Sequence, residues 1–446
     1  MTDRLTKATR AAVATGSAGR AWLITAVLFV FMLLNWADKA VLGLAATPIM
    51  KEMGLSASEF GLASSAVFFL FGISALFTGT LADRVGTNRL LLVMAVIWSI
   101  AMLPALLLPS LGFLIVGRTL LGAAEGPASP VASLATMKWF PAERRNLPVS
   151  IVVSGALLGL AIAAPTLSWV IANWGWKWSF ALLAILGVVW AVVWRIVGKE
   201  GPYLGADEHG QQPEVSGSAA AERPTVSAWR IVGSRTWLTF TFALFAAYWT
   251  SALLMTWIPS FLTTQMGFST VTAGNLTGIS AFFCAVAMLV QGFLGNRLMS
   301  RGRSSRLALG VISSVAVLAS GLAMVGFVLL PGNGPVRIVL LVIAFSLSNA
   351  VGSSAPNAIG YIIPAGKHGF GLGAYIAIGT SAGVVAPALT GVLLDAAASP
   401  TAGYTIGFAV AAGLLLVSGV ALLIGGNPDR DRVRLASTQP AVSAAA

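Results

Sequence analysis

Four ionisable side chains lie within long apolar stretches of this sequence: Asp38, Lys39, Arg118 and Glu125. A charged side chain inside the hydrocarbon layer of a membrane costs at least about 2.5–3.5 kcal/mol, and such residues usually mark a pathway for an ion or a substrate. Arg118 and Glu125 are seven residues apart, so on a helix they share one face, about 10.5 Å apart along the axis. Both must face the interior of a helix bundle, because lipid cannot solvate them.

Two acids beside fixed cations suit the coupled binding of a proton and an anion. Arg118 stays charged, and its planar fork can clamp a carboxylate through two hydrogen bonds. Two effects act in opposite directions on the protonation of Asp38 and Glu125, since burial favours the protonated form and the neighbouring cations favour the ionised form. A group in this balance can gain or lose a proton when its surroundings change. The alternative interpretation is a static network of buried ion pairs that only fixes helix packing.

The composition indicates that these charges sit in a membrane protein. Hydrophobic residues make up 57% of the 446 residues and charged residues only 9%, whereas soluble chains carry about 25% charged residues. The mean hydropathy is +0.87. The 48 glycines suit membrane helices, whose backbones approach closely through small residues.

A helix needs about 20 apolar residues to cross the hydrocarbon layer. Twelve stretches meet this length, so we expect an all-α membrane protein whose 12 transmembrane helices form two six-helix halves. Most of the 27 Lys and Arg residues fall on the cytoplasmic side if the N-terminus is cytoplasmic, which places both termini there. The stretches are Ala21–Pro48, Glu59–Leu81, Leu90–Leu108, Leu111–Met137, Leu147–Ile171, Trp178–Val197, Trp237–Phe261, Val271–Gly295, Leu307–Leu330, Val336–Ile363, Phe370–Leu394 and Tyr404–Gly425.

A polar interval that contains three prolines and many of the acidic residues divides the chain. It is typical of a linker between two halves. The predicted organisation is a cytoplasmic N-tail at 1–20, a first half at 21–198, a linker at 199–235, a second half at 236–426 and a cytoplasmic C-tail at 427–446.

The two halves share a short repeat. Gly79-Thr-Leu-Ala-Asp83-Arg84 ends the second apolar stretch, and Gly292-Phe-Leu-Gly-Asn296-Arg297 ends the eighth. Parallel repeats of six helices are one way in which transporters are built. Gly79–Arg89 resembles the loop signature of the major facilitator superfamily, G-x-x-x-D-R-x-G-R-[KR], although Thr87-Asn88 replace its usual basic pair. The resemblance implies a gating role for Gly79, Asp83, Arg84, Gly86 and Arg89, and for Asn296 and Arg297 in the second copy.

A narrower resemblance extends over nearly the whole chain. Asn35-Trp-Ala-Asp-Lys39 is similar to the N-Y-x-D-R motif of the anion:cation symporter family, Arg118–Pro127 resembles its fourth helix, and Trp139–Arg144 resembles its W-F-P-x-x-E-R loop. The resemblance implies proton coupling by Asp38 and Glu125, anion binding by Arg118 and Lys39, substrate contacts for Asn35 and Trp36, and gating by Glu143 and Arg144. Lys39 departs from the family's arginine and loses the planar fork.

Neutral side chains supply the substrate candidates in the second half. A polar residue in a membrane helix often only bonds to a neighbouring helix, and this alternative applies to every one of them. The candidates are Tyr248, Trp249, Gln291, Asn357, Tyr361 and Ser381.

These features predict a monomeric secondary transporter of the inner membrane that imports a small organic anion, a sugar acid or another carboxylate, together with protons by alternating access. Its partners are the anion, protons and the lipid bilayer, without nucleic acid. It needs no cofactor or metal beyond a proton gradient. The sequence holds no G-x-x-x-x-G-K-[ST] loop for ATP, so neither an enzyme nor an ATP-driven pump is expected. Export or antiport of an organic anion or drug is the first alternative, and a transporter-like receptor is a remote one.

Overall fold

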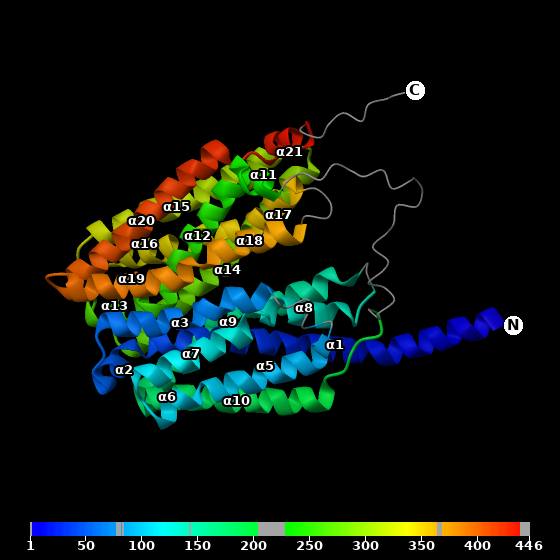
Figure 1. Ribbon diagram of the computed structural model, residues 1–446, viewed down its shortest axis with the longest axis horizontal. Coiled ribbons are helices and arrows are strands. Elements are labelled where there is room, and N and C mark those ends of the chain that lie inside the picture. Colours follow the sequence, from blue (N-terminus) through cyan, green and yellow to red (C-terminus); the bar gives the residue numbers. More distant parts are fainter. Residues whose placement is uncertain are drawn as a thin grey trace.

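The computed structural model describes residues 2–76, 82, 84–141, 144–203, 228–363 and 368–437, and all regular secondary structure within these ranges is helical. The chain forms two bundles that lie side by side, one from each half of the sequence (Figure 1). The expected all-α membrane architecture is confirmed.

The first bundle contains the central charges. It consists of α1 (Thr2–Leu44), α2 (Ala46–Met53), α3 (Ala57–Leu76), α5 (Thr87–Ala101), α6 (Leu103–Leu107), α7 (Leu111–Glu125), α8 (Ala128–Met137), α9 (Asn146–Trp174) and α10 (Trp176–Val197).

The second bundle includes one π-helical turn at Arg306–Val311 and one 3-10 turn at Leu347–Ala350. Its α-helices are α11 (Ala228–Val232), α12 (Arg235–Thr256), α13 (Ile258–Thr264), α14 (Thr270–Ser300), α15 (Ile312–Leu329), α16 (Pro335–Ser346), α17 (Val351–Ile362), α18 (His368–Thr380), α19 (Ala382–Ala396), α20 (Pro400–Gly425) and α21 (Pro428–Ser437).

Eleven helices of the described chain are long and apolar enough to cross a membrane. The predicted stretch Leu111–Met137 is the one that differs, because Gly126-Pro127 divides it into α7 and α8. Proline lacks the N–H that a helix interior requires, and its ring clashes with the preceding turn. The break comes directly after Glu125, so the intramembrane carboxylate ends a helix.

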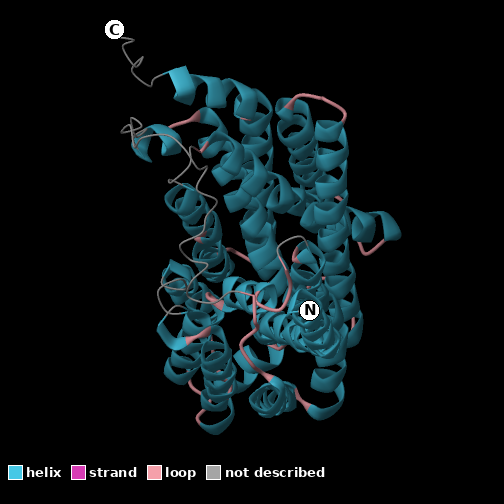
Figure 2. Ribbon diagram, turned by 90° about the vertical axis from the view of Figure 1, so that its right-hand side faces the viewer, coloured by secondary structure: helices cyan, strands magenta, loops and turns pink. Residues whose placement is uncertain are grey.

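The molecule has two opposite ends, which we call the terminal face and the distal face. The terminal face holds Val197, Arg235 and Gly425, where α10 ends, α12 begins and α20 ends; it faces the viewer in Figure 2. The distal face is opposite and holds the turns at Gly54 and Gly175. At this face Glu52 accepts hydrogen bonds from Lys177 and Trp176, which hold the pKa of the Glu52 carboxyl below its ordinary value.

Hydrogen bonds join the two halves toward the distal face, along a contact that we call the distal seam. The carboxylate of Asp395 in α19 accepts hydrogen bonds from the backbone N–H groups of Ala57 and Ser58, at 3.0 and 2.7 Å. These donors begin α3, so one half caps a helix of the other. Deeper in the seam, the Ser65 hydroxyl accepts a hydrogen bond of 3.1 Å from the backbone of Ala388.

Glycines bring the helices of the seam into backbone contact. A Cβ atom on Gly43 would overlap the carbonyl group of Met255, and one on Gly61 would overlap the carbonyl oxygen of Pro387. A third close approach joins Gly278 of α14 to Pro165 of α9. Without a hydrophobic force between helices in lipid, such close packing is what holds membrane helices together.

At the terminal face, carboxylates that follow the last long helix of each half tie that half together. In the first half, Glu200 accepts hydrogen bonds from Thr87 Oγ1 and the Asn88 amide and pairs with Lys138 at 2.6 Å. Burial raises the pKa of this carboxyl, but the hydrogen bonds outweigh burial and hold its pKa below the ordinary value. In the second half, Asp429 accepts a hydrogen bond of 3.0 Å from the backbone of Ser305.

We predict that Gly43→Ala opens the distal seam, because the new methyl group meets backbone that cannot move aside. Overpacking of this kind costs about 1–3 kcal/mol, which corresponds to a shift of the seam equilibrium by roughly 5- to 150-fold. Spin labels at the exposed Lys51 and Ala398, in a Cys284→Ala background, measure the separation by electron paramagnetic resonance.

The matched control is Gly413→Ala, since no atom lies within 4 Å of a Cβ at that position. We expect a longer Lys51–Ala398 distance in the Gly43 variant only. Identical distances in both variants would contradict the backbone contact.

Candidate functional site

The four intramembrane charges meet in one place, which we call the charge centre: Asp38, Lys39, Arg118 and Glu125. All four residues are buried, with at most 7% of any one exposed. Asp38 and Lys39 come from α1, and Arg118 and Glu125 come from α7. The seven-residue spacing in α7 therefore turns both of its charges toward the same partner helix, as predicted.

Lys39 and Glu125 form the ion pair at the centre of this group. Lys39 Nζ lies 2.9 Å from Glu125 Oε2, with side chains that are 4% and 0% exposed. The ammonium group also donates a hydrogen bond of 2.7 Å to Asn35 Oδ1. It lies 5.4 Å from the ring centre of Trp36 and 5.2 Å from that of Phe71, at distances where aromatic faces attract a cation.

Arg118 holds the backbone of α1 and forms no ion pair with a carboxylate of the described residues. Its Nη1 donates to the carbonyl oxygen of Asp38 at 2.8 Å, and its Nη2 donates to that of Lys39 at 3.1 Å. Both arms of the planar fork are thus used on two consecutive carbonyl groups. This geometry fixes the position of α1 against α7 and so aims Lys39 at Glu125.

A small cavity between the two halves opens beside Lys39. Its volume is about 50 Å³, which holds a few water molecules at most. Lys39 is the cation on its wall within the described chain. The first half contributes Trp36, Lys39, Phe68 and Phe71, and the second half contributes Tyr248, Ser251, Ala252, Met255 and Asn349.

Comparison with known families decides the kind of protein. The model of the Major Facilitator Superfamily matches residues 28–387. The chain belongs to this superfamily. It is a multi-pass membrane transporter and not an enzyme.

Two relatives cover nearly the whole chain. A probable sulfoacetate transporter of Cupriavidus necator is 29% identical over 90% of this chain and 93% of its own length. The hexuronate transporter of Bacillus subtilis is 27% identical over 90% of this chain and 95% of its own length. These relatives agree with the resemblance to anion:cation symporters.

Solved structures with little sequence identity share the fold. A bacterial homologue of the human lysosomal transporter Spinster, captured inward-facing and unoccupied, has a TM-score of 0.77 at 16% identity, covering 94% of this chain and 98% of that one. A D-xylose–proton symporter has a TM-score of 0.71 at 15% identity, covering 92% and 98%.

Within this superfamily fold, the neutral candidates of the second half separate into two groups. Tyr248 lines the cavity beside Lys39. Among the others, buried Gln291 donates to the carbonyl of Ala308, and Arg432 lies 4.6 Å from the ring centre of Tyr361. Trp249 is buried. Exposed Asn357 donates to the carbonyl of Ser353 in its own helix, and exposed Ser381, between α18 and α19, donates to the carbonyl of Ile378. None of these five residues lines the cavity between the halves.

Sequence reasoning missed Asn349 and Ser251. Asn349 lies on the 3-10 turn between α16 and α17, where its Oδ1 accepts a hydrogen bond of 3.2 Å from Ser251 and its Nδ2 donates to the carbonyl of Phe345. The adjacent polar pair Ser348-Asn349 within an apolar stretch is a sequence signal that could have indicated this position.

The predicted gating residues that the structure describes lie away from the charge centre. Gly79, Asp83 and Glu143 fall outside the described residues. Gly86 precedes α5 with a φ of 83°, a conformation that favours glycine, next to Glu200. The others are exposed: Arg84, Arg89, Arg144, Asn296 and Arg297. Their gating role stays a prediction.

No group of His, Cys, Asp or Glu among the described residues is suited to a metal.

We predict that Arg118→Lys is as damaging as Arg118→Gln, because lysine lacks the planar fork whose two terminal nitrogens each donate to one carbonyl. Loss of charged, buried hydrogen bonds lowers the free energy of unfolding by about 3 kcal/mol. Denaturation of the purified protein in mixed detergent micelles measures the effect. Arg303→Lys, at an exposed arginine, is the control, and full stability of Arg118→Lys would show that charge alone is needed.

Proposed function

We propose that this transporter imports a small organic anion together with protons, and that Lys39 is the cation that meets the anion. The observation that carries the proposal is the Lys39–Glu125 ion pair at the wall of the cavity between the halves. Lys39 has one carboxylate partner here, and a carboxylate or sulfonate of a substrate offers the same chemistry.

A proton on Glu125 links the two binding events. Glu125 Oε1 is buried without a hydrogen-bond partner in the described structure, so this oxygen is available to a proton. Protonation removes the negative charge that neutralises Lys39, and a buried cation without a partner is unstable. The substrate anion then takes the place of the Glu125 carboxylate. Proton and anion therefore bind together, as symport requires.

Asp38 and Arg118 support this exchange from either side. Asp38 is a second buried carboxyl within the charge centre, and we assign it as a second proton carrier. Arg118 keeps its bonds to the backbone of α1 and provides a constant positive charge. Both terminal nitrogens of Arg118 donate to backbone carbonyls, whereas its buried Nε has no hydrogen-bond partner within the described chain. Arg118 does not line the cavity and Lys39 does, which favours Lys39 as the group that contacts the substrate.

The distal seam supports a proposal of alternating access. With both termini in the cytoplasm, the orientation that the basic residues favour, the seam closes the path from outside the cell. Rocking of the two halves about the charge centre would open the seam and expose Lys39 to the other side. The cavity of about 50 Å³ must widen in either direction before an organic anion fits.

The walls of the cavity favour a compact anion with few hydroxyl groups. Trp36, Phe68 and Phe71 present aromatic surface. Ser251 and Asn349 already bond to each other. A polyhydroxylated sugar acid would bury hydroxyl groups that lack partners, which is costly. Of the substrates named for the two relatives, the compact sulfoacetate suits these walls better than a hydroxyl-rich hexuronate.

We predict that Glu125→Gln uncouples transport from the proton gradient, because the amide mimics a permanently protonated carboxyl. In proteoliposomes, an imposed inward proton gradient should accelerate sulfoacetate uptake by the parent protein. The variant should still exchange sulfoacetate across the membrane but should show no acceleration. Asp38→Asn is expected to weaken the response to the gradient as well.

Glu52→Gln is the matched control, since Glu52 is a carboxylate at the distal face. It should respond to the gradient like the parent. An undiminished response in the Asp38→Asn, Glu125→Gln double variant would refute proton coupling at this site.

We also predict that sulfoacetate raises the melting temperature of the purified protein more than glucuronate does at the same concentration. A ligand at 100 times its Kd stabilises a folded protein by about 2.7 kcal/mol. Lys39→Gln should abolish this stabilisation, measured by thermal denaturation in detergent. Equal or greater stabilisation by glucuronate would contradict the proposed compact substrate.

A further inference from the structure

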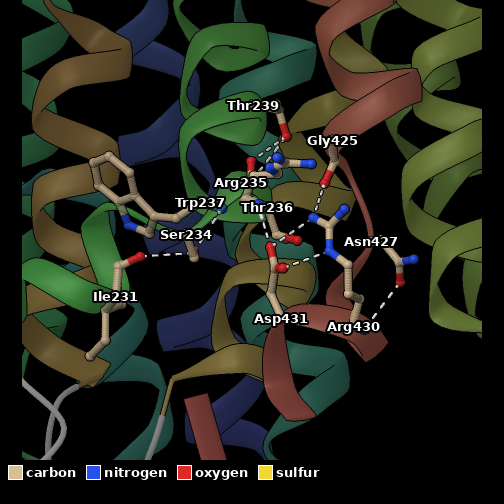
Figure 3. Close-up of polar contacts among 10 residues, drawn as sticks. All are labelled: Ile231, Ser234, Arg235, Thr236, Trp237, Thr239, Gly425, Asn427, Arg430 and Asp431. Atoms are coloured by element: carbon tan, nitrogen blue, oxygen red, sulfur yellow. Dashed lines mark hydrogen bonds and ion pairs between the residues drawn. The ribbon is translucent and has the colours of Figure 1, made fainter. Parts of the chain in front are cut away.

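A second cavity lies at the terminal face, away from the charge centre. It has a volume of about 450 Å³ and is bordered by α11, the first turn of α12, and α21. Three arginines line it, Arg230, Arg235 and Arg434, together with the single acid Asp431. Figure 3 shows Arg235, Asp431 and Arg430 around the start of α12.

The acid in this cavity is already engaged. Asp431 Oδ1 pairs with Arg430 Nε at 2.8 Å, and Oδ2 accepts a hydrogen bond of 2.8 Å from the backbone N–H of Thr236. Burial raises the pKa of the Asp431 carboxyl, but these bonds outweigh burial and hold its pKa below the ordinary value. The charge of Asp431 is therefore balanced by Arg430 and by the N-terminus of α12.

An excess of positive charge is left on the cavity wall. Arg230 and Arg235 are both exposed, and neither is paired with a carboxylate of the described chain. Arg434 of α21 also borders the cavity. Several arginines that converge on one cavity are suited to a phosphate group, whose oxygens match the guanidinium fork.

Exposed apolar side chains lie on helices that border or adjoin the cavity. Trp229 is 81% exposed, Ile424 is 68% exposed and Val433 is 67% exposed. They belong to α11, α20 and α21, which border or adjoin the cavity. Tryptophan is typical of the membrane–water interface, and arginines beside exposed apolar side chains suit a surface that contains anionic lipids. Cavity and apolar residues together resemble the two parts of a phospholipid, its headgroup and its acyl chains.

We propose that the cavity between α11, α12 and α21 binds a phosphate group, presented by an anionic phospholipid or as free phosphate. The arginines hold the phosphate, and the binding ties α21 to the start of the second half. The exposed Trp229, Ile424 and Val433 favour the lipid as the source. The site is independent of the charge centre and of the substrate.

The test compares binding of phosphatidylglycerol and of inorganic phosphate. Native mass spectrometry of the intact protein counts phosphatidylglycerol adducts against phosphatidylcholine, and thermal denaturation measures stabilisation by inorganic phosphate. The Arg230→Gln, Arg235→Gln double variant should bind phosphatidylglycerol roughly 30-fold more weakly, the equivalent of about 2 kcal/mol for two basic residues. Each single variant should lose part of the effect.

The matched control is Arg301→Gln, Arg303→Gln, which removes two exposed arginines beyond the end of α14 that do not line the cavity. It should bind both probes like the parent. Loss of lipid adducts alone in the double variant identifies a lipid site, and loss of the phosphate effect alone identifies a site for the free anion. Unchanged binding of both probes by a folded double variant would overturn the proposal.

Discussion

The buried ion pair between Lys39 and Glu125 is the interaction on which the rest of the site depends. Both charges are out of water, where each is tolerated only with the other, and removing one partner of such a pair typically costs about 3–5 kcal/mol. Arg118 makes the pair possible by gripping two carbonyls of α1. A change in the charge of Glu125 therefore alters the contacts that hold α1 to α7, at the boundary between the halves.

Much of this site could be predicted from sequence, since a charge in an apolar stretch stands out and a seven-residue spacing defines a shared face. The direction of Arg118 could not, because its acceptors are backbone carbonyls, which every residue has. Trp249 lies on a helix with little polar asymmetry, and Ser381 lies between α18 and α19, so no sequence signal indicated the direction of either side chain. The position of Asn349 at the cavity could not be predicted, because it depends on a local 3-10 turn that only the packing of α16 and α17 defines.

The terminal face explains a departure from the superfamily signature. Thr87 and Asn88 replace the usual basic pair, and in the structure both donate hydrogen bonds to Glu200. The second half repeats the arrangement without the same residues, since Asp429 follows α20 and bonds to Ser305 before the π-helical turn. Each half is thus closed by its own carboxylate. This agrees with halves that move as rigid bodies and not as separate helices.

The glycine contacts of the distal seam have a consequence for solvent. Gly43 packs on the carbonyl of Met255, and Pro259, four residues further on, has no N–H to offer that oxygen. When the halves separate, this acceptor has to be hydrated, because a bare carbonyl in an apolar crevice is costly. Opening of the seam would therefore take up water, and we expect the balance between the closed and open states to depend on osmotic pressure.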